Sequence, residues 1–551
     1  MKIKFCGAAT GVTGSCHLVS TNEHKILLDC GMFQGGKAME ALNHEDFPFN
    51  PAEIECVLVS HAHVDHCGRL PLLVKGGFKG PIYASDATAD LLSVMLLDSA
   101  HIHEQDAEWQ SKRNMRAGKP AVEPLYTTHD VEDTVKLIRP VRYDQLLELN
   151  DQMKAVFNDA GHILGSAIIE LFCKENEETR KLVFSGDLGM NERPILNDPK
   201  IIHKADYVVM ETTYGNRIHE ENATSISKLL EIAVMTAKRG GNVVIPSFAV
   251  GRTQELLYEL NKLYDGTGPM HDALKDIPVY VDSPMAIRAT EIFRDNAQVY
   301  DEETRKYILS GDHPLDFKNL TFSQTSAESQ AINANPKPKI IISASGMCDA
   351  GRIRHHLKHN LWGKKNSIVF VGYQAEGTLG RRLLDGAKTV SLFGEEIGVS
   401  AEIYNLEGFS GHADRDSLFA WLSGFEKQPK KIFLVHGETD SKEDFADYVK
   451  QNRGWDCEVV RGYDEYDLET GEAPVVENVE LDFATDEDVD SLRMRISAMH
   501  EELENILYNT NLAVGGEISS NRMAELKNII AELEKDIYSL GGAITKEDRD
   551  E

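Results

Sequence analysis

The sequence of 551 residues has no uninterrupted apolar run approaching the ~20 residues that a membrane-spanning helix needs. The strand-like start, Met1 to Phe5, leads into glycines, and no apolar core of a secretory signal follows it. The eight cysteines include no C-x-x-C pair, the spacing typical of zinc ribbons and thiol redox motifs. We therefore expect a cytoplasmic protein whose cysteines are reduced packing thiols.

Positive charge is also scarce, because 58 lysines and arginines stand against 89 aspartates and glutamates, a formal net charge of −31. A surface that coats nucleic acid needs clustered cations, so this balance argues against that class of protein. It still permits an enzyme of nucleic acid that carries a local basic track. The chain is too long for one ordinary core, so we expect two or more domains.

The most informative stretch is His61-Ala62-His63-Val64-Asp65-His66. The apolar run Cys56–Val59 before it is typical of a buried strand that Ser60 ends. In a still-extended loop, His61 and His63 point the same way, because side chains alternate with period two. A carboxylate and a third imidazole follow at once. Zinc takes nitrogen and oxygen ligands, so this stretch predicts a site for two neighbouring metal ions.

Six further residues share one kind of position, at or just after a short apolar run and next to a glycine or a turn: Asp29, His162, Asp187, Glu211, His412 and His436. Each position alone is weak evidence for a functional site, because a strand-end acid such as Asp29 or Glu211 is often only a turn former. Together they predict one site along one edge of a sheet. If the strand before Asp29 lies beside the one before His61, Asp29 can orient a metal-bound imidazole.

Between Asn216 and about Ser400 the pattern changes to alternating strands and helices. Four strand-like runs cover residues 242–246, 278–284, 339–347 and 367–374. Buried strands that alternate with helices indicate a parallel α/β sheet with both faces covered, and hence a domain of its own. Its ligands are expected at the carboxyl ends of the strands.

This region also contains the cations that an acidic nucleic-acid enzyme needs. The track that follows the Ser345 loop has few acids: Arg352, Arg354, His355, His356, Lys358, His359, Lys364 and Lys365. Ser343 and Ser345 offer hydroxyl and backbone donors to phosphate at a strand end. We predict substrate contacts at Arg252, Ser343, Ser345, Arg352, Tyr373 and Arg381. The alternative is an ordinary solvated helix face.

From about Thr485 the chain is acidic and has two amphipathic helical patterns, separated by Gly515 and Gly516. A helical hairpin is expected there. Its role is either packing on the body of the protein or self-association into a homodimer.

These motifs, in this order, resemble the metallo-β-lactamase superfamily and its β-CASP branch of nucleic-acid-processing nucleases. The likeness is strongest to the endonuclease subunit of the cleavage and polyadenylation specificity factor and its bacterial and archaeal RNA-processing relatives. It covers roughly residues 1–465, with no departure at the principal positions. The residues that match the superfamily's motifs and then the branch's own are Asp29, His61–His66, His162 and Asp187, followed by Glu211, His412 and His436.

The resemblance implies an α/β fold, an αββα sandwich interrupted by a β-CASP domain. Roughly 200 residues separate Glu211 from His412, more than a compact hydrolase core needs. We expect the sandwich at residues 1–214 and 399–480, the inserted domain at 215–398 and an acidic helical extension at 481–551.

The resemblance also implies two zinc ions, for which manganese or iron are alternatives. His61, His63 and His162 bind one ion, Asp65, His66 and His436 bind the other, and Asp187 bridges both. Asp65 and Asp187 count as catalytic residues with His412, the expected general acid, and Glu211, its hydrogen-bond partner. The activity implied is RNA hydrolysis to 5′-phosphate and 3′-hydroxyl ends, internally or from the 5′ end.

Three rival functions stay open. A thioesterase or lactonase shares the binuclear core but lacks the inserted domain and the Glu211–His412 pair. The branch also contains DNA nucleases. A scaffold that binds nucleic acid or partners without cutting is disfavoured by the complete set of ligands.

Overall fold

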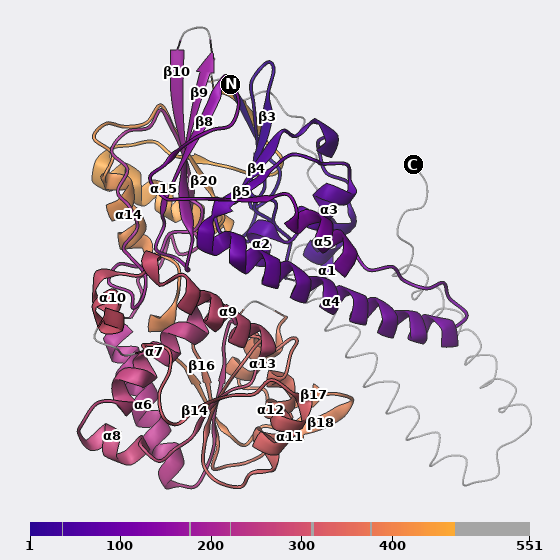
Figure 1. Ribbon diagram of the computed structural model, residues 1–551, viewed down its shortest axis with the longest axis vertical. Helices are drawn as coiled ribbons and strands as arrows, with labels where there is room; N and C mark the ends of the chain where they lie inside the picture. The colour runs from indigo at the N-terminus through magenta and orange to yellow at the C-terminus, as the bar shows by residue number, and fades with distance from the viewer. Residues whose placement is uncertain (36, 176–177, 221, 310–312, 375–376, 469–551) are drawn as a thin grey trace, which may run out of the picture. The chain divides into compact units, whose positions relative to one another are not determined.

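The computed structural model describes residues 1–468, apart from residues 36, 176–177, 221, 310–312 and 375–376 (Figure 1). The described residues belong to the first of two units, Met1–Val476, and the second is Glu477–Glu551. The predicted helical extension at 481–551, with its hairpin, lies outside the described residues. None of the described helices combines the length and the apolar composition of a bilayer span.

Two seven-stranded sheets face each other. The first has the order β22 (Glu465–Asp467), β1 (Lys2–Phe5), β2 (His17–Ser20), β3 (Lys25–Leu28), β4 (Cys56–Leu58), β5 (Ile82–Ser85) and β6 (Ile138–Val141). The second has the order β21 (Glu458–Val459), β20 (Lys431–Val435), β11 (Tyr207–Glu211), β10 (Glu178–Phe184), β9 (Ala167–Glu175), β8 (Met153–Asp159) and β7 (Leu146–Glu148). Apolar side chains from both sheets, such as Phe5 and Phe433, form the core between them.

Helices cover the outer faces of this sandwich (Figure 1). The first sheet is covered by α3 (Leu70–Lys75), α4 (Asp86–Arg116) and α5 (Thr128–Val135), and the second by α14 (Arg415–Ser423) and α15 (Thr439–Arg453). Side chains that alternate along each strand supply both the helix-facing and the sheet-facing core. In β3, Leu27 faces the helices while Ile26 and Leu28 face the second sheet. The predicted αββα sandwich is confirmed.

The inserted part is a six-stranded sheet in which every strand pair is parallel. Its order is β14 (Leu320–Phe322), β13 (Val279–Val281), β15 (Ile340–Ser343), β12 (Val243–Pro246), β16 (Ser367–Phe370) and β19 (Glu402–Asn405). Helices α6 (Asn222–Lys238), α7 (Arg252–Tyr264) and α9 (Pro284–Asp295) cover one face. The other face packs on α11 (Ser326–Ala334), α12 (Ile353–Asn360) and α13 (Leu379–Leu384). The predicted parallel α/β insertion is confirmed.

The four predicted strands are β12, β13, β15 and β16, and both edge strands differ from expectation. Strand β14 gives only a weak sequence signal, because its alternating run Leu-Thr-Phe is three residues long and none of the three is fully buried. Strand β19 pairs with β16, so the inserted sheet reaches Asn405, past the boundary predicted at residue 398. Sheet membership depends on a partner strand that the local pattern does not reveal.

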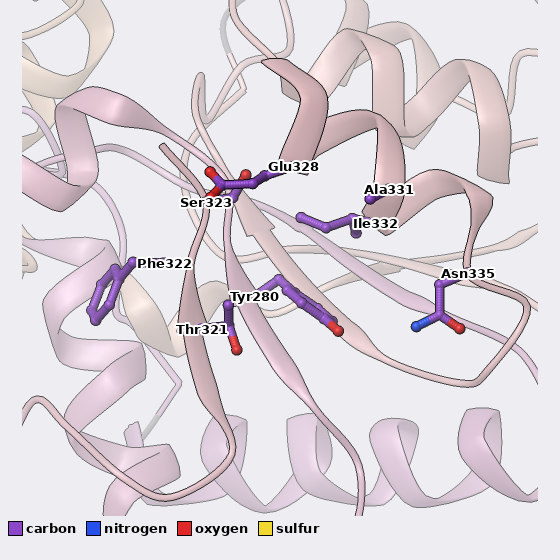
Figure 2. A pocket seen from close by; sticks show the side chains of 8 residues that line it. All are labelled: Tyr280, Thr321, Phe322, Ser323, Glu328, Ala331, Ile332 and Asn335. Carbon is purple, nitrogen blue, oxygen red and sulfur yellow. The ribbon is translucent and has the colours of Figure 1, made fainter. Parts of the chain in front are cut away.

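A cavity of about 260 Å³ opens between β13, β14 and α11, and Figure 2 shows its lining. Apolar and neutral groups dominate that lining, including Tyr280, Thr321 and Ile332. None of the predicted site residues lies there.

Candidate metal centre

Parallel strands bring the predicted ligands together. His61 follows β4, and His162, Asp187 and His436 follow β8, β10 and β20, which run in one direction in the second sheet. The carboxyl ends of such strands lie at one edge. The peptide N–H of Ala167 donates to the carbonyl of Ser60 at 2.8 Å and joins the two sheets there. Long-range strand pairing therefore assembles the site.

Four donor groups form a first cluster: His61, His63, His162 and Asp187. Nδ1 of His63 lies 3.1 Å from Nε2 of His61 and 3.1 Å from Nε2 of His162. Oδ2 of Asp187 lies 3.4 Å from Nε2 of His61 and 3.6 Å from Nε2 of His162. The three imidazoles and the carboxylate thus surround one point.

A second cluster lies on the other side of Asp187 and contains Asp65, His66 and His436. Nε2 of His66 lies 3.0 Å from Nε2 of His436 and 3.3 Å from Oδ1 of Asp187. Oδ2 of Asp65 lies 3.6 Å from Nε2 of His436. Asp187 therefore turns one carboxylate oxygen toward each cluster, the arrangement that a bridging ligand requires.

The donor atoms fit divalent metal ions. Zinc–nitrogen bonds of about 2.0–2.1 Å place tetrahedral ligands about 3.3 Å apart. The measured separations between donor atoms, 3.0 to 3.6 Å, bracket that value. Oδ1 of Asp187 is buried and has no hydrogen-bond partner among the described residues. A buried carboxylate oxygen without a donor is costly, and a bound cation removes that cost.

Burial also prepares the first cluster for metal binding. It lowers the pKa of His63 to about 4 and holds the pKa of His61 and of His162 well below the ordinary value. These rings are consequently neutral, which is the form that binds a metal ion. The cluster needs no deprotonation before it takes up a cation near neutral pH.

Asp29 holds the second cluster in place. Its carboxylate accepts hydrogen bonds from the Ser15 hydroxyl at 3.0 Å, the Ser60 hydroxyl at 2.9 Å and the Ser60 N–H at 2.7 Å. The same carboxylate lies 2.7 Å from Nδ1 of His66, which directs Nε2 of that ring toward His436. This contact agrees with the orienting role predicted for Asp29.

Two residues of the centre that follow strands, Asp29 beside His66 and the candidate ligand His436, adopt left-handed backbone conformations that non-glycine residues rarely take. Asp29 has φ 61° and His436 has φ 50°. Such conformations are unfavourable and persist where the surroundings enforce them, most often at functional sites. The hydroxyl of Thr213 lies 3.1 Å from Nδ1 of His436 and fixes that ring. Sequence reasoning missed Ser15, Ser60 and Thr213, although Ser60 directly precedes His61 and Thr213 lies two positions after Glu211.

His412 and Glu211 form a pair beside the bridging carboxylate. Nδ1 of His412 lies 3.3 Å from each carboxylate oxygen of Glu211 and 3.8 Å from Oδ2 of Asp187. Glu211 is fixed because it accepts the N–H of Leu188 at 2.6 Å. Burial favours neutral His412, but the charges of Glu211 and Asp187 prevail and raise its pKa to about 9. The ring is 22% exposed, so a protonated imidazole is accessible beside the metal clusters.

Comparison with known proteins follows the same division of the chain. Family profiles match residues 18–212 to the metallo-beta-lactamase superfamily domain and residues 253–383 to the Beta-Casp domain. Residues 396–460 match the Zn-dependent metallo-hydrolase RNA specificity domain. Ribonuclease TTHA0252 of Thermus thermophilus is 39% identical over 440 residues, 80% of this chain and 94% of the relative. The chain belongs to the β-CASP branch of the metallo-β-lactamase superfamily.

Archaeal relatives of this β-CASP protein extend the comparison. Transcription termination factor FttA of Methanocaldococcus jannaschii is 33% identical over 464 residues, and that of Pyrococcus horikoshii is 31% identical over 471 residues. Each match covers 82% of this chain and 69% of the archaeal protein.

The β-CASP sheet meets the metal centre through its helix α7. Gly251, with φ 80°, packs so closely on Ile163 that a Cβ atom there would lie 3.0 Å from Cγ2 of Ile163, beside His162. Arg252 pairs with Glu255 one turn later, and its guanidinium carbon lies 5.8 Å from the ring centre of Phe409. Of the predicted substrate contacts, Arg252 is therefore next to the centre.

A second arginine, Arg193, ties the α7 region to the loop that carries His412. It donates to Oε1 of Glu255 at 2.6 Å, to the carbonyl of Gly408 at 3.1 Å and to the carbonyl of Ser410. No sequence signal identifies Arg193 or Glu255, because they meet only through folding of distant segments.

Several other predicted substrate contacts use their polar groups inside the β-CASP fold. The Ser343 hydroxyl donates to the carbonyl of Asp282 at 2.7 Å, and Ser345 donates to that of Ala350 at 3.2 Å. Arg352 pairs with the Asp282 carboxylate at 2.6 Å, and buried His356 lies 2.6 Å from the same group. The predicted track is therefore not one continuous exposed surface. Much of the track lies on α12, an amphipathic helix, and one side of such a helix is buried against the sheet.

The remaining two predicted contacts have exposed side chains. Tyr373 is 45% exposed, and Arg381 of α13 is 44% exposed and pairs at 3.0 Å with Asp385, the residue that follows this helix.

Proposed function

We propose that this β-CASP protein is a metal-dependent ribonuclease that hydrolyses RNA phosphodiester bonds and leaves 5′-phosphate and 3′-hydroxyl ends. The observation that carries the proposal is the bridging geometry of Asp187, whose two oxygens face two ligand clusters while His412 and Glu211 lie beside it. Two relatives, a ribonuclease and a transcription termination factor, support RNA as the substrate.

The proposed metals are two zinc ions, with manganese or iron as alternatives. His61, His63 and His162 would hold one ion and Asp65, His66 and His436 the other, with Asp187 as a ligand between the two groups. When bound, such a pair of ions polarises the scissile phosphate and supplies a nucleophilic water at neutral pH.

The chain's own residues handle the leaving group. A water oxygen forms the new bond to phosphorus, and the bond from phosphorus to the ribose 3′ oxygen breaks. That oxygen needs a proton, which Nε2 of His412 donates, because Nδ1 faces Glu211. Glu211 keeps the imidazolium form available, and solvent reprotonates His412 after release of the 3′-hydroxyl product.

The substrate contacts that we retain are those outside the internal network of the β-CASP sheet. Arg252 lies at the metal centre, where a guanidinium suits a phosphate of the RNA backbone. Tyr373 and Arg381 remain proposed contacts through their exposed side chains. A homodimer and a cytoplasmic location likewise stay predictions.

The test is cleavage of end-labelled, unstructured RNA by the whole chain, with and without a chelator and with metal restored. We expect cutting that chelation stops, that metal restores and that Asp187→Ala abolishes. RNAs with 5′-triphosphate, 5′-monophosphate and 5′-hydroxyl ends then separate internal cutting from digestion at the 5′ end. A parallel DNA substrate and a thioester test the rivals, and thioester hydrolysis without RNA cleavage would contradict the proposal.

A further inference from the structure

A short hairpin in the inserted domain presents an aromatic residue in an unfavourable position. Strands β17 (Thr389–Leu392) and β18 (Glu395–Gly398) pair with Leu392 opposite Glu395, so Phe393 and Gly394 form a two-residue turn. Both have positive φ, 53° and 79°. Such turns favour asparagine and glycine, and a bulky residue there is rare. Yet the Phe393 side chain is 47% exposed, so burial does not explain the choice.

The ring of Phe393 lies on the first turn of α12. It stacks on the imidazole of His355, with ring centres 4.3 Å apart and planes at 20°. The guanidinium carbon of Arg354 lies 5.1 Å from the centre of the same ring. One small area therefore joins two flat rings and a cation.

The outer face of α12 continues this chemistry. Ile353 and Leu357 face the core, whereas His355 and His359 are exposed and Arg354 and Lys358 are half-buried. Exposed Trp362, Lys364 and Lys365 follow the helix. Residues 353–366 contain no acidic residue, in a chain of net charge −31. The nearby acids include two on the hairpin, where Glu395 pairs with Lys358 at 2.6 Å and Glu396 is exposed, together with Asp349 beside Arg354 and Glu402, which pairs with Arg239.

The helix starts on the side of the sheet that approaches the metal centre. The loops after β12, β15 and β16 meet at Phe248, where Cβ atoms at Gly346 and Gly372 would lie 2.9 and 3.3 Å from its ring. The first of these loops continues into Gly251, which packs on Ile163 beside His162. The outer face of α12 thus runs from the end of the sheet where these strands finish to the end where they begin.

We propose that this face, with the hairpin tip, is an accessory binding surface for single-stranded RNA flanking the scissile bond. We call it the α12 surface and define it by Arg354, His355, His359, Trp362, Lys364, Lys365 and Phe393. The proposal rests on the proposed ribonuclease function. Exposed rings stack on bases regardless of sequence, while cations contact the phosphates.

The chemistry favours a single strand over a duplex or a protein. Bases in a duplex are already stacked and offer no free face to Phe393 or Trp362. A protein partner is expected to need a contiguous apolar patch, whereas here the rings are separated by cations. Lys364 and Lys365 suit successive phosphates of a flexible strand.

The first arm of the test measures RNA binding alone, using chelator-treated protein and a labelled, unstructured oligonucleotide. We expect Phe393→Asn combined with Trp362→Ala to weaken binding about 5-fold or more, since base stacking of this kind is strong. Asparagine tolerates the positive φ, so the hairpin is retained. The double change Lys364→Gln with Lys365→Gln should lower the salt slope of log affinity by about 1.4, from ~0.7 per phosphate contact on a single strand.

A matched control is available on α4, where Arg113 lies 5.9 Å from the ring centre of Trp109, which is 65% exposed. Trp109→Ala combined with Arg113→Gln removes the same chemistry from another place. We expect wild-type RNA affinity from this control. An equal loss of affinity in the control and in the α12 variants would overturn the proposal.

The second arm compares cleavage of a long RNA with that of one truncated to the nucleotides around the scissile bond. We expect the α12 variants to raise KM for the long RNA about 5-fold and to leave kcat on the short one unchanged. If wild type cleaves and binds RNA but the α12 variants have the same affinity and KM, the proposal of an RNA-binding α12 surface is overturned and the ribonuclease proposal stands. If wild type binds RNA through this surface without cleaving it, the ribonuclease proposal fails instead.

Discussion

Glu211 places both carboxylate oxygens 3.3 Å from Nδ1 of His412, so a full negative charge faces one nitrogen of the proposed general acid. The other ring nitrogen is then available to a leaving group. This pairing leads to the first prediction.

We predict that Glu211→Gln shifts the alkaline limb of the kcat–pH profile to lower pH. The carboxylate raises the pKa of His412, so the uncharged amide lowers it, and the protonated acid disappears at a lower pH than in wild type. The rate loss should therefore grow as pH rises. Metal content, measured in parallel, should be unchanged. A loss that is uniform across pH would show that Glu211 acts on folding or metal binding rather than on His412.

Asp29→Asn tests the orientation of the second cluster. Asparagine tolerates the left-handed backbone at this position and keeps the size of the side chain, so the change isolates the carboxylate charge. We expect metal affinity to fall by about 10- to 100-fold, because partners of ligating histidines contribute on that scale. Competition with a chelator measures the affinity directly. Unchanged affinity would rule out the orienting role of Asp29.

Arg193→Ala should destabilise the fold by roughly 3 kcal/mol, because it removes one of the arginines paired with the largely buried carboxylate of Glu255. Chemical denaturation measures the change. Arg381→Ala is the matched control, since Arg381 pairs with Asp385 in an exposed helical pair worth at most about 0.5 kcal/mol. Equal effects of the two substitutions would contradict the assigned burial of the Arg193 network.

Asp282 gives a pH dependence of stability. Burial favours its neutral form, but His356, Ser329 and Arg352 outweigh burial and lower its pKa from 3.8 to about 2. The carboxylate therefore contributes stability that is present above about pH 4 and lost as pH falls toward 2. We predict that Asp282→Asn costs about 2 kcal/mol at neutral pH, and that wild type and variant converge on acidification. A constant difference between pH 5 and pH 3 would contradict the assignment.

Much of the metal centre could be predicted from the sequence, because its residues occupy strand ends and one dense histidine stretch. His61 and His63 follow β4 directly, so local pattern and chemistry coincide. The supporting residues could not be predicted in the same way. Arg193 and Glu255 have the composition of surface residues, and only the fold brings them together and largely removes them from solvent. Local pattern likewise could not assign β19 to its sheet, since only pairing with β16 decides that.

The predicted basic track shows a different limit. Arg352 and His356 have the composition of a phosphate-binding surface, yet both contact Asp282 inside the domain. The sequence shows that this helix is rich in cations, but it does not show which of them face the interior of the domain. The neighbouring residue, His355, is on the outer side and stacks on Phe393.

The central claim is that a metal centre bridged by Asp187 cuts RNA with His412 as the acid for the leaving oxygen. It is tested most directly by cleavage of one RNA bond whose bridging 3′ oxygen is replaced by sulfur, a leaving group that needs no proton. On the natural bond, we predict that His412→Ala lowers kcat by about 10²- to 10⁴-fold. On the sulfur-substituted bond, variant and wild type should cleave at similar rates. An equal defect on both bonds, or no cleavage of either by wild type, would contradict the account.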